Sequence, residues 1–178
     1  MPYNKKREVI YDEKRYLKYN NYITFGIGKA YAKIRTTDQN VLNLDFHFHL
    51  NKEYFQAGFF MSGDELLANN NLEFHLGYGK RYEKNNINLA AFAGPSYSAF
   101  NIRTSDSTGV FKNKHYELVG GYLCLQAVYK IKYDVGLGIE LFTSVCREQQ
   151  LYGARFIIFF SGGYRGPEKA FHLKTSKP

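Results

Sequence analysis

Histidine and carboxylate residues stand close together in two stretches of the sequence, and these residue types could perform acid–base chemistry or bind a metal ion. His47 and His49 follow Asp45, and further along the chain His75 follows Glu73. Imidazole and carboxylate groups are ligands that transition metals accept. The same groups also satisfy one another by hydrogen bonding when they are buried. We predict the second arrangement, a buried polar network, and no metal, cofactor or catalytic residue.

A second set of reactive residue types lies in or near the longest polar connection, residues 101–114. Ser105, Asp106, Ser107 and His115 combine a nucleophile, an acid and a base, as an enzyme that modifies lipids would require. Nothing in the sequence fixes their geometry, and polar connections are generally rich in these residue types. A lipid-modifying barrel enzyme stays open as an alternative, but we expect the protein to be non-enzymatic.

The first two histidines belong to a segment in which apolar and polar residues alternate at every position. Its apolar residues are Leu42, Leu44, Phe46, Phe48 and Leu50, and its polar residues are Asn43, Asp45, His47, His49 and Asn51. Because a β-strand turns successive side chains to opposite faces, this pattern predicts a strand. A turn at Lys52-Glu53 would pair Leu50 with Phe55 in the next strand, and both apolar rows would then share one face.

The same alternation recurs along the chain and predicts eight strands. Their approximate ranges are 22–33, two strands within 41–63, 71–82, 87–100, 115–130, 133–145 and 151–163. Tight turns alternate with longer polar connections, which is typical of an up-and-down antiparallel sheet, and eight such strands can close into a barrel. In both 115–130 and 133–145 the apolar residues stand at odd-numbered positions. To bring both apolar rows to one face, the turn near Ile131-Lys132 requires a bulge or an odd number of residues.

We therefore predict an all-β protein, a closed eight-stranded up-and-down antiparallel barrel over residues 21–165. Residues 1–20 are expected to form a charged N-terminal tail and residues 166–178 a basic C-terminal tail. Sixteen Tyr, fifteen Phe and sixteen Gly are consistent with strands. Two cysteines are too few for a disulfide framework.

The orientation of the two faces distinguishes two kinds of barrel. A soluble carrier of the lipocalin kind points its apolar row inward around a ligand, whereas a transmembrane barrel points it at lipid. The polar rows mix acids with basic residues, as a packed polar lumen requires, and we assign to the lumen Asp45, His47, His49, Glu73, His75, Arg81, Asp134, Glu140 and Arg155. The apolar rows hold almost no charge, and we assign to the lipid-facing surface Leu44, Phe46, Phe48, Phe59, Leu76, Leu137, Ile139, Phe156 and Ile158. We favour the transmembrane barrel, and a lipocalin-like barrel that binds an apolar ligand is the soluble alternative.

The bulk properties limit the possible partners. The formal net charge is +8, and much of the positive charge lies near the two ends of the chain. Basic ends can contact an anionic lipid or a partner surface. The sequence shows no pattern of a nucleic-acid recognition helix and no aromatic-basic RNA signature, so no nucleic acid is expected.

With eight strands, three tight turns, four longer connections and a polar lumen, the chain resembles the small outer-membrane barrels of the OmpA-transmembrane and OmpX kind. The last strand also resembles their assembly signal through Gly153, Phe156 and Ile158. The resemblance implies a place in the outer membrane of a Gram-negative cell, lipid as the main partner, and no wide pore. It also implies a structural, adhesion or accessory role, in which loops or basic tails contact an envelope protein. The first residues, MPYNKKREV, lack the apolar core of a signal peptide, so we expect the chain to be a mature or engineered form with Met1 added, or a sequence with a misplaced start.

Overall fold

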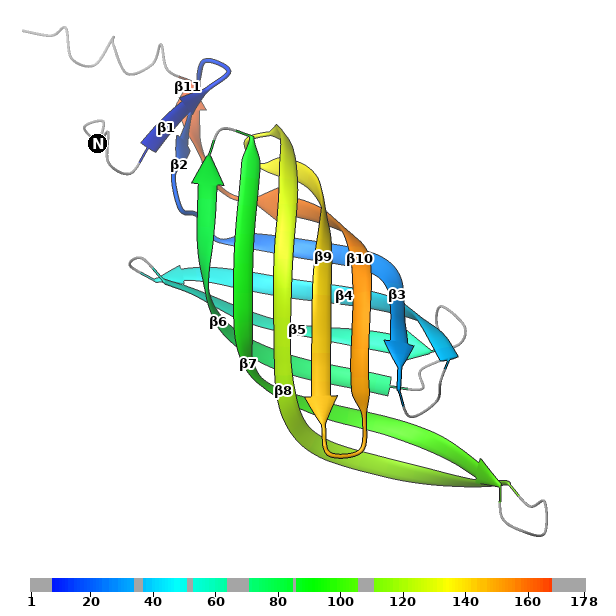
Figure 1. Ribbon diagram of the computed structural model, residues 1–178. Coiled ribbons are helices and arrows are strands. Elements are labelled where there is room, and N and C mark those ends of the chain that lie inside the picture. Colours follow the sequence, from blue (N-terminus) through cyan, green and yellow to red (C-terminus); the bar gives the residue numbers. More distant parts are fainter. Residues whose placement is uncertain are drawn as a thin grey trace, which may run out of the picture.

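The computed structural model describes residues 8–33, 37–50, 53–63, 71–84, 86–105 and 111–167, and their regular structure is entirely β (Figure 1). The strands are β1 (Glu8–Tyr11), β2 (Lys14–Leu17), β3 (Tyr22–Ala32), β4 (Thr37–Leu50), β5 (Glu53–Gly63), β6 (Asn71–Lys84), β7 (Ile87–Ser105), β8 (Phe111–Lys132), β9 (Val135–Cys146), β10 (Gln150–Ser161) and β11 (Tyr164–Pro167). Across these residues, no helix is long and apolar enough to cross a membrane.

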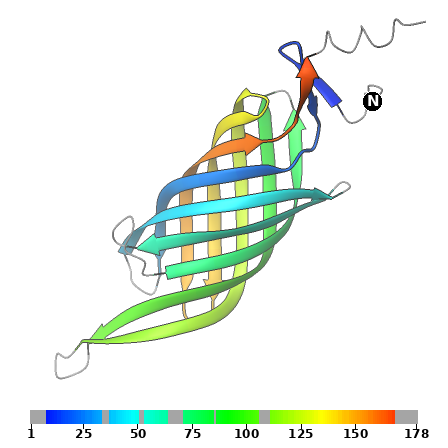
Figure 2. The same cartoon turned by 180° about the vertical axis from the view of Figure 1, so that it is seen from behind.

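Strands β3 to β10 form a closed barrel in which each strand pairs antiparallel with its neighbours in sequence. The barrel closes where β10 pairs with β3, in a register that runs from Leu151 opposite Ala32 to Ser161 opposite Tyr22. The two opposite views in Figures 1 and 2 show the resulting tilted cylinder. The closed eight-stranded antiparallel barrel predicted from the sequence is confirmed.

Burial alternates from residue to residue along each barrel strand, as in the pattern of β3, where Tyr22 is buried, Ile23 exposed and Thr24 buried. The predicted pairing of Leu50 with Phe55 is wrong by two residues, since Leu50 lies opposite Glu53 and Phe48 lies opposite Phe55. Glu53 thus belongs to β5, and its carboxylate accepts a hydrogen bond from the Tyr78 hydroxyl of β6 at 2.8 Å. A shift of two residues preserves which face each side chain occupies.

A bulge explains the parity of the turn between β8 and β9. Lys130 lies opposite Gly136, whereas Lys132 lies opposite Val135, so Ile131 is an extra residue on β8. One extra residue restores the alternation that both strands require. Of the two solutions that the sequence left open, the structure has the bulge.

The ends of the chain form a separate three-stranded sheet, β1-β2-β11, which we call the cap. Figure 1 shows it at the end of the barrel where the β6–β7 and β8–β9 turns lie. The predicted N-terminal tail is therefore wrong for residues 8–17, and the barrel ends at Ser161 rather than at residue 165. Residues 1–7 and 168–178 of the predicted tails lie outside the described residues.

Tyrosine rings attach the cap to the barrel. The Tyr16 ring lies 4.6 Å from the Tyr133 ring of the β8–β9 turn and 5.7 Å from Tyr164 of β11, between centroids. The Leu17 amide donates a hydrogen bond to the Gly163 carbonyl at 2.7 Å, and the Tyr133 hydroxyl donates to the Leu17 carbonyl at 3.3 Å. Burial raises the pKa of the Tyr133 phenol, so it remains a neutral hydrogen-bond donor.

At the opposite end, β7 and β8 extend past their neighbours as a two-stranded ribbon. They pair with each other as far as Ser105 opposite Phe111, but β6 accompanies β7 only to Phe100, and β9 accompanies β8 only from Gly120. We call residues 101–105 and 111–119 the ribbon, which is prominent in Figure 2. The prediction that 101–114 is entirely a loop is wrong for these strand residues, because the β7–β8 ladder continues beyond the barrel.

Replacing Tyr16 with Ala should detach the cap without unfolding the barrel. Loss of a buried aromatic ring costs about 3 kcal/mol, which is on the order of a hundredfold in the open fraction of the cap. Limited trypsin digestion should then cut faster at Lys14 and Arg15, while far-ultraviolet circular dichroism changes little. Tyr152→Ala, which removes an exposed ring from the barrel wall, is the control, and equal cleavage rates in the two variants would contradict this account.

Candidate functional site: a filled polar lumen and an apolar outer wall

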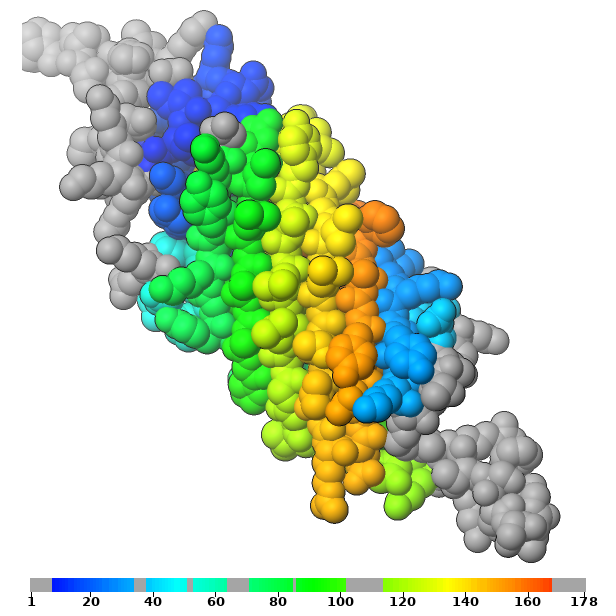
Figure 3. Space-filling view, viewed as in Figure 1, coloured from blue at the N-terminus to red at the C-terminus, as the bar shows by residue number. Residues whose placement is uncertain are grey.

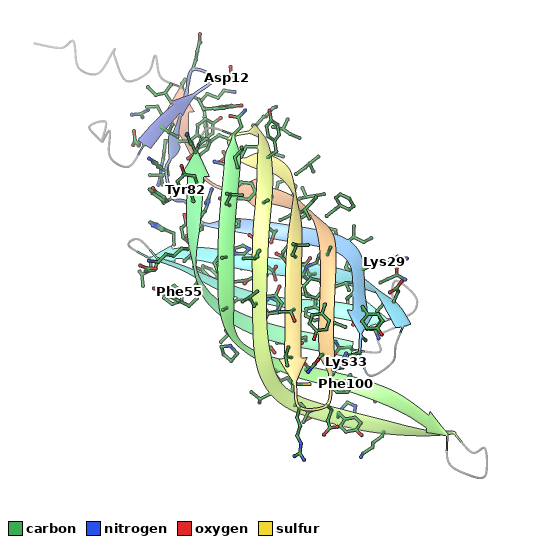
Figure 4. All side chains as sticks on the ribbon, viewed as in Figure 1. Asp12, Lys29, Lys33, Phe55, Tyr82 and Phe100 are labelled. Atoms are coloured by element: carbon green, nitrogen blue, oxygen red, sulfur yellow. The ribbon has the colours of Figure 1, made fainter. Side chains whose placement is uncertain are left out.

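The inward side chains fill the barrel and are mostly polar. Arg155, Tyr54, Phe60, Phe92 and Lys130 are among the largest, and each is less than 2 % exposed or at that limit. Figure 4 shows these inward side chains crowded between the ribbons, with labelled Phe55 and Tyr82 on the outside. Because water hardly reaches these inward side chains, the described residues leave no wide aqueous channel through the lumen.

An ion pair occupies the middle of the lumen. Arg155 of β10 donates to Glu140 of β9 through Nε at 2.8 Å and also through Nη2. Gln126 of β8 donates to the second carboxylate oxygen at 2.6 Å, and the Arg155 guanidinium lies 4.1 Å from the Phe142 ring centroid. Both oxygens of the Glu140 carboxylate thus accept hydrogen bonds, and the Arg155 guanidinium has its counter-ion beside it and an aromatic ring next to it.

A second buried polar group connects β4 with β6 across the intervening strand β5. His75 Nε2 of β6 lies 2.9 Å from Asp45 Oδ1 of β4, and Asn43 donates to Asp45 Oδ2 at 2.7 Å. Gly58 of β5 lies between them, and a Cβ there would lie 2.0 Å from Asp45 Oδ1. The pair therefore depends on a glycine in the intervening strand.

A third group closes the lumen below the cap. Arg81 donates to Asn88 at 2.7 Å, to the Asn20 carbonyl at 3.2 Å and to Glu83 at 2.8 Å. Lys130 Nζ lies 2.7 Å from the other Glu83 oxygen. Arg81 was predicted to face the lumen, whereas Glu83 and Lys130 were not, although each occupies an inward-facing position in the alternation of its own strand.

The remaining predicted lumen residues are spread along the barrel. Glu73 accepts hydrogen bonds from Ser98 at 2.7 Å and from Ser144, both buried. His47 stacks on Tyr22 at 3.9 Å between centroids, and its Nε2 lies 3.1 Å from Thr24 Oγ1.

His49 lies near the cap, where its ring stacks on Tyr19 and its amide donates to Asn21. The histidines therefore do not converge on one point. Among the described residues, no group of three or more His, Cys, Asp or Glu side chains could hold a metal ion.

Asp134 is the one predicted lumen residue that lies elsewhere. Its strand begins only at Val135, so Asp134 stands in the β8–β9 turn. Its carboxylate accepts hydrogen bonds from Ser161 Oγ at 2.8 Å and from the Gly163 amide at 3.0 Å. The lumen assignment of Asp134 is wrong, since this residue holds the start of β11 against the barrel.

The outer wall is apolar on every strand of the barrel. Seven of the nine residues assigned to the lipid-facing surface are among the exposed large hydrophobic side chains, namely Phe46, Phe48, Leu76, Leu137, Ile139, Phe156 and Ile158. Leu44 and Phe59 also face outward and are half-buried by their neighbours. Figure 3 shows the outward side chains of β7 to β10 as one continuous surface below the cap.

Of the four residues considered for catalysis, His115 is the one whose side chain the structure describes. Ser105 ends β7, and its side chain together with Asp106 and Ser107 lies outside the described residues. His115 is exposed on the ribbon, where its Nδ1 lies 2.9 Å from Asn101 Oδ1 and its Nε2 lies 3.3 Å from Glu117 Oε1.

A barrel with a filled polar lumen and an apolar exterior has the inside-out arrangement of a small transmembrane β-barrel. In agreement with this class, the fold is that of small eight-stranded outer-membrane barrels. The structure of Neisserial surface protein A (NspA) matches with a TM-score of 0.60 at 9% identity, over 80% of this chain and 97% of that chain. The N-terminal β-barrel domain of Pseudomonas aeruginosa OprF matches with a TM-score of 0.59 at 10% identity, over 80% and 98%.

A third match is the attachment invasion locus protein of Yersinia pestis, Ail, with a TM-score of 0.56 at 11% identity, over 83% of this chain and 99% of that chain. No protein-family model matches the sequence, and no curated protein matches it.

Removing Arg155 should be costly, because it leaves the Glu140 carboxylate buried without its counter-ion. Arg155→Met should lower the free energy of unfolding by about 3–5 kcal/mol, measured by urea titration of the folded protein. Adding Glu140→Gln should recover part of the loss. Arg147→Met, at a side chain that is 88% exposed, is the matched control, and an equal loss in both single variants would contradict the role of the ion pair.

Proposed function

We propose that this protein is a non-enzymatic β-barrel of the outer membrane of a Gram-negative cell. The observation that carries the proposal is the apolar outer wall, which surrounds a lumen of buried charges. In hydrocarbon every backbone group requires an internal partner, and a closed barrel provides one. A soluble barrel would expose charged residues on this wall.

The two ends of the barrel then face different compartments. Short turns of such barrels lie on the periplasmic side and longer connections lie outside. The cap shares its end with the β6–β7 and β8–β9 turns, and the ribbon projects from the opposite end (Figure 1). We assign the cap to the periplasmic side and the ribbon to the cell exterior.

The filled lumen opposes the soluble alternative and a transport role. A lipocalin-like carrier requires an apolar cavity inside the barrel, but Asp45, Glu140 and Arg155 occupy that position here. A solute would have to displace the Arg155–Glu140 pair and then the Arg81–Glu83–Lys130 group. The barrel therefore acts as an anchor, and its contacts with partners lie at its ends.

The ribbon is the surface best suited to external contact, as in an adhesion or accessory protein. Among the described residues, β6 pairs with β7 only as far as Phe100 and β9 pairs with β8 only from Gly120, so another chain can add to the outer edges of residues 102–105 and 111–119. Its sequence includes Arg103, Lys112 and Lys114. One Ail structure, with a TM-score of 0.51, contains a heparin analogue, sucrose octasulfate. These basic residues support contact with an anionic surface. Among the described residues, no nucleophile lies beside the His115–Glu117 contact, which gives no support to the enzyme alternative.

Membrane insertion and the absence of a wide pore can be tested together. The protein should require detergent for extraction from membranes and should migrate differently on a gel before and after boiling. In planar bilayers it should give no large stable conductance. A protein that stays in solution without detergent would contradict the proposal, and porin-like conductance would contradict the filled lumen.

A positive charge at mid-wall should be costly in a depth-dependent way. Phe46→Arg should destabilise the inserted barrel by about 2–4 kcal/mol, and Leu50→Arg, on the same face at the end of β4, should cost about 1 kcal/mol or less. Urea unfolding in lipid vesicles measures both values. Equal costs at the two positions would contradict a wall that faces hydrocarbon.

A further inference from the structure

A crevice of about 730 Å³ lies at the cap end of the barrel, on its outer side. The link between β2 and β3, which contains Tyr19, Asn20 and Asn21, forms one wall. The first residues of β3, the last part of β4 and the end of β10 form the other, and Arg165 of β11 completes the lining. The crevice thus lies where the cap joins the barrel.

The lining of the crevice is divided by chemistry. Toward the cap it consists of polar groups, which include Asn20, Asn21, His49, Ser161 and Arg165. Toward the middle of the barrel it consists of large apolar side chains of the outer wall, namely Ile23, Phe46, Phe48 and Phe160. The crevice therefore crosses the border between the apolar wall and the polar end of the molecule.

Its charge is positive. Arg165 lines the crevice and is exposed, and Lys18 stands beside it with Nζ 5.5 Å from the ring centroid of Tyr19, another lining residue. Among the described residues that line it, none is acidic. The Asp134 carboxylate of the β8–β9 turn contacts one lining residue, Ser161, and it already accepts hydrogen bonds from Ser161 Oγ and from the Gly163 amide. An anion at the polar end would thus meet two cations and the two side-chain amides of Asn20 and Asn21.

We propose that this crevice binds one anionic phospholipid of the leaflet at the cap end. The phosphate would lie among Arg165, Lys18 and the amide groups, and an acyl chain would lie on Phe48 and Phe160. Two observations select this occupant: the apolar half is continuous with the outer wall, and the polar half is cationic. The inference rests on the proposed membrane location.

Tryptophan fluorescence provides a direct test, because the chain contains no Trp. Phe160→Trp places a single reporter in the crevice, and Leu125→Trp places one on the outer wall of β8, away from it. Each variant is reconstituted in phosphatidylcholine vesicles that contain a small fraction of lipid with brominated chains. The brominated lipid is phosphatidylglycerol in one sample and phosphatidylcholine in the other. The ratio of the quenching in the first sample to that in the second removes the effect of the reporter's depth, because the depth is the same in both.

The crevice reporter should be quenched about twofold more strongly by brominated phosphatidylglycerol than by brominated phosphatidylcholine, as expected for two basic residues near a headgroup. The wall reporter should be quenched equally by both. Lys18→Gln with Arg165→Gln should remove the preference. Lys29→Gln with Lys33→Gln, which makes the same charge change at the opposite end of the barrel (Figure 4), should leave it intact.

The other possible quenching results separate a failure of the lipid site from a failure of the membrane proposal. If both lipids quench both reporters equally, the lipid site is wrong and the membrane proposal stands. If the wall reporter is not quenched at all, the membrane proposal itself fails. A preference seen at both reporters, or one that survives Lys18→Gln with Arg165→Gln, would overturn the crevice as the source of selectivity. Heat modifiability on a gel verifies folding of every variant, and Phe48→Trp is the second crevice reporter if Phe160→Trp does not fold.

Discussion

Closure of β10 onto β3 is the constraint on which the rest of the structure depends. Without the pairing of residues 151–161 with 22–32, both strands would present free backbone edges in the middle of an apolar wall. The seam requires close approach, since a Cβ at Gly28 would lie 2.1 Å from the Ala154 carbonyl oxygen. Closing eight strands also fixes the width of the lumen, so the inward side chains must fill it.

Closure also explains why the lumen is charged. Each strand must pair in one register only, and this register is unique only if the two faces of the strand differ in polarity. A slip by one residue would place Arg155, Glu140 and Asp45 on the apolar wall and Phe156 inside. The pairs also connect different strands, with Glu140 on β9 bound to Arg155 on β10 and to Gln126 on β8. Buried charges therefore specify one arrangement of the wall more than they add to its stability.

Apolar and polar residues alternate with a period of two, and this alternation allowed the strands, their faces and the closed barrel to be predicted from the sequence. The lumen residues Asp45, His75, Glu140 and Arg155 followed from the same alternation. The cap could not be predicted, since β1 and β2 have four residues each and their turn uses Asp12 and Glu13 at positive φ rather than an Asn-Gly pair. The third strand of the cap, β11, lies far away in the sequence. Parity would have found Glu83 and Lys130, whereas Asp134 was misplaced because no local pattern marks the start of β9 at Val135.

The cap changes how the barrel meets its surroundings. In a plain barrel the apolar wall would end at short turns, but here the link from Lys18 to Asn21 runs along the end of the wall and places polar groups beside Ile23 and Phe160. The Tyr16–Tyr133 contact holds this link in place, and the Arg81–Glu83–Lys130 group fills the lumen behind it. The same few residues thus close the lumen and shape the outer border of the wall. The two ends of the barrel therefore differ in form, with a compact three-stranded sheet at one and an extended two-stranded ribbon at the other.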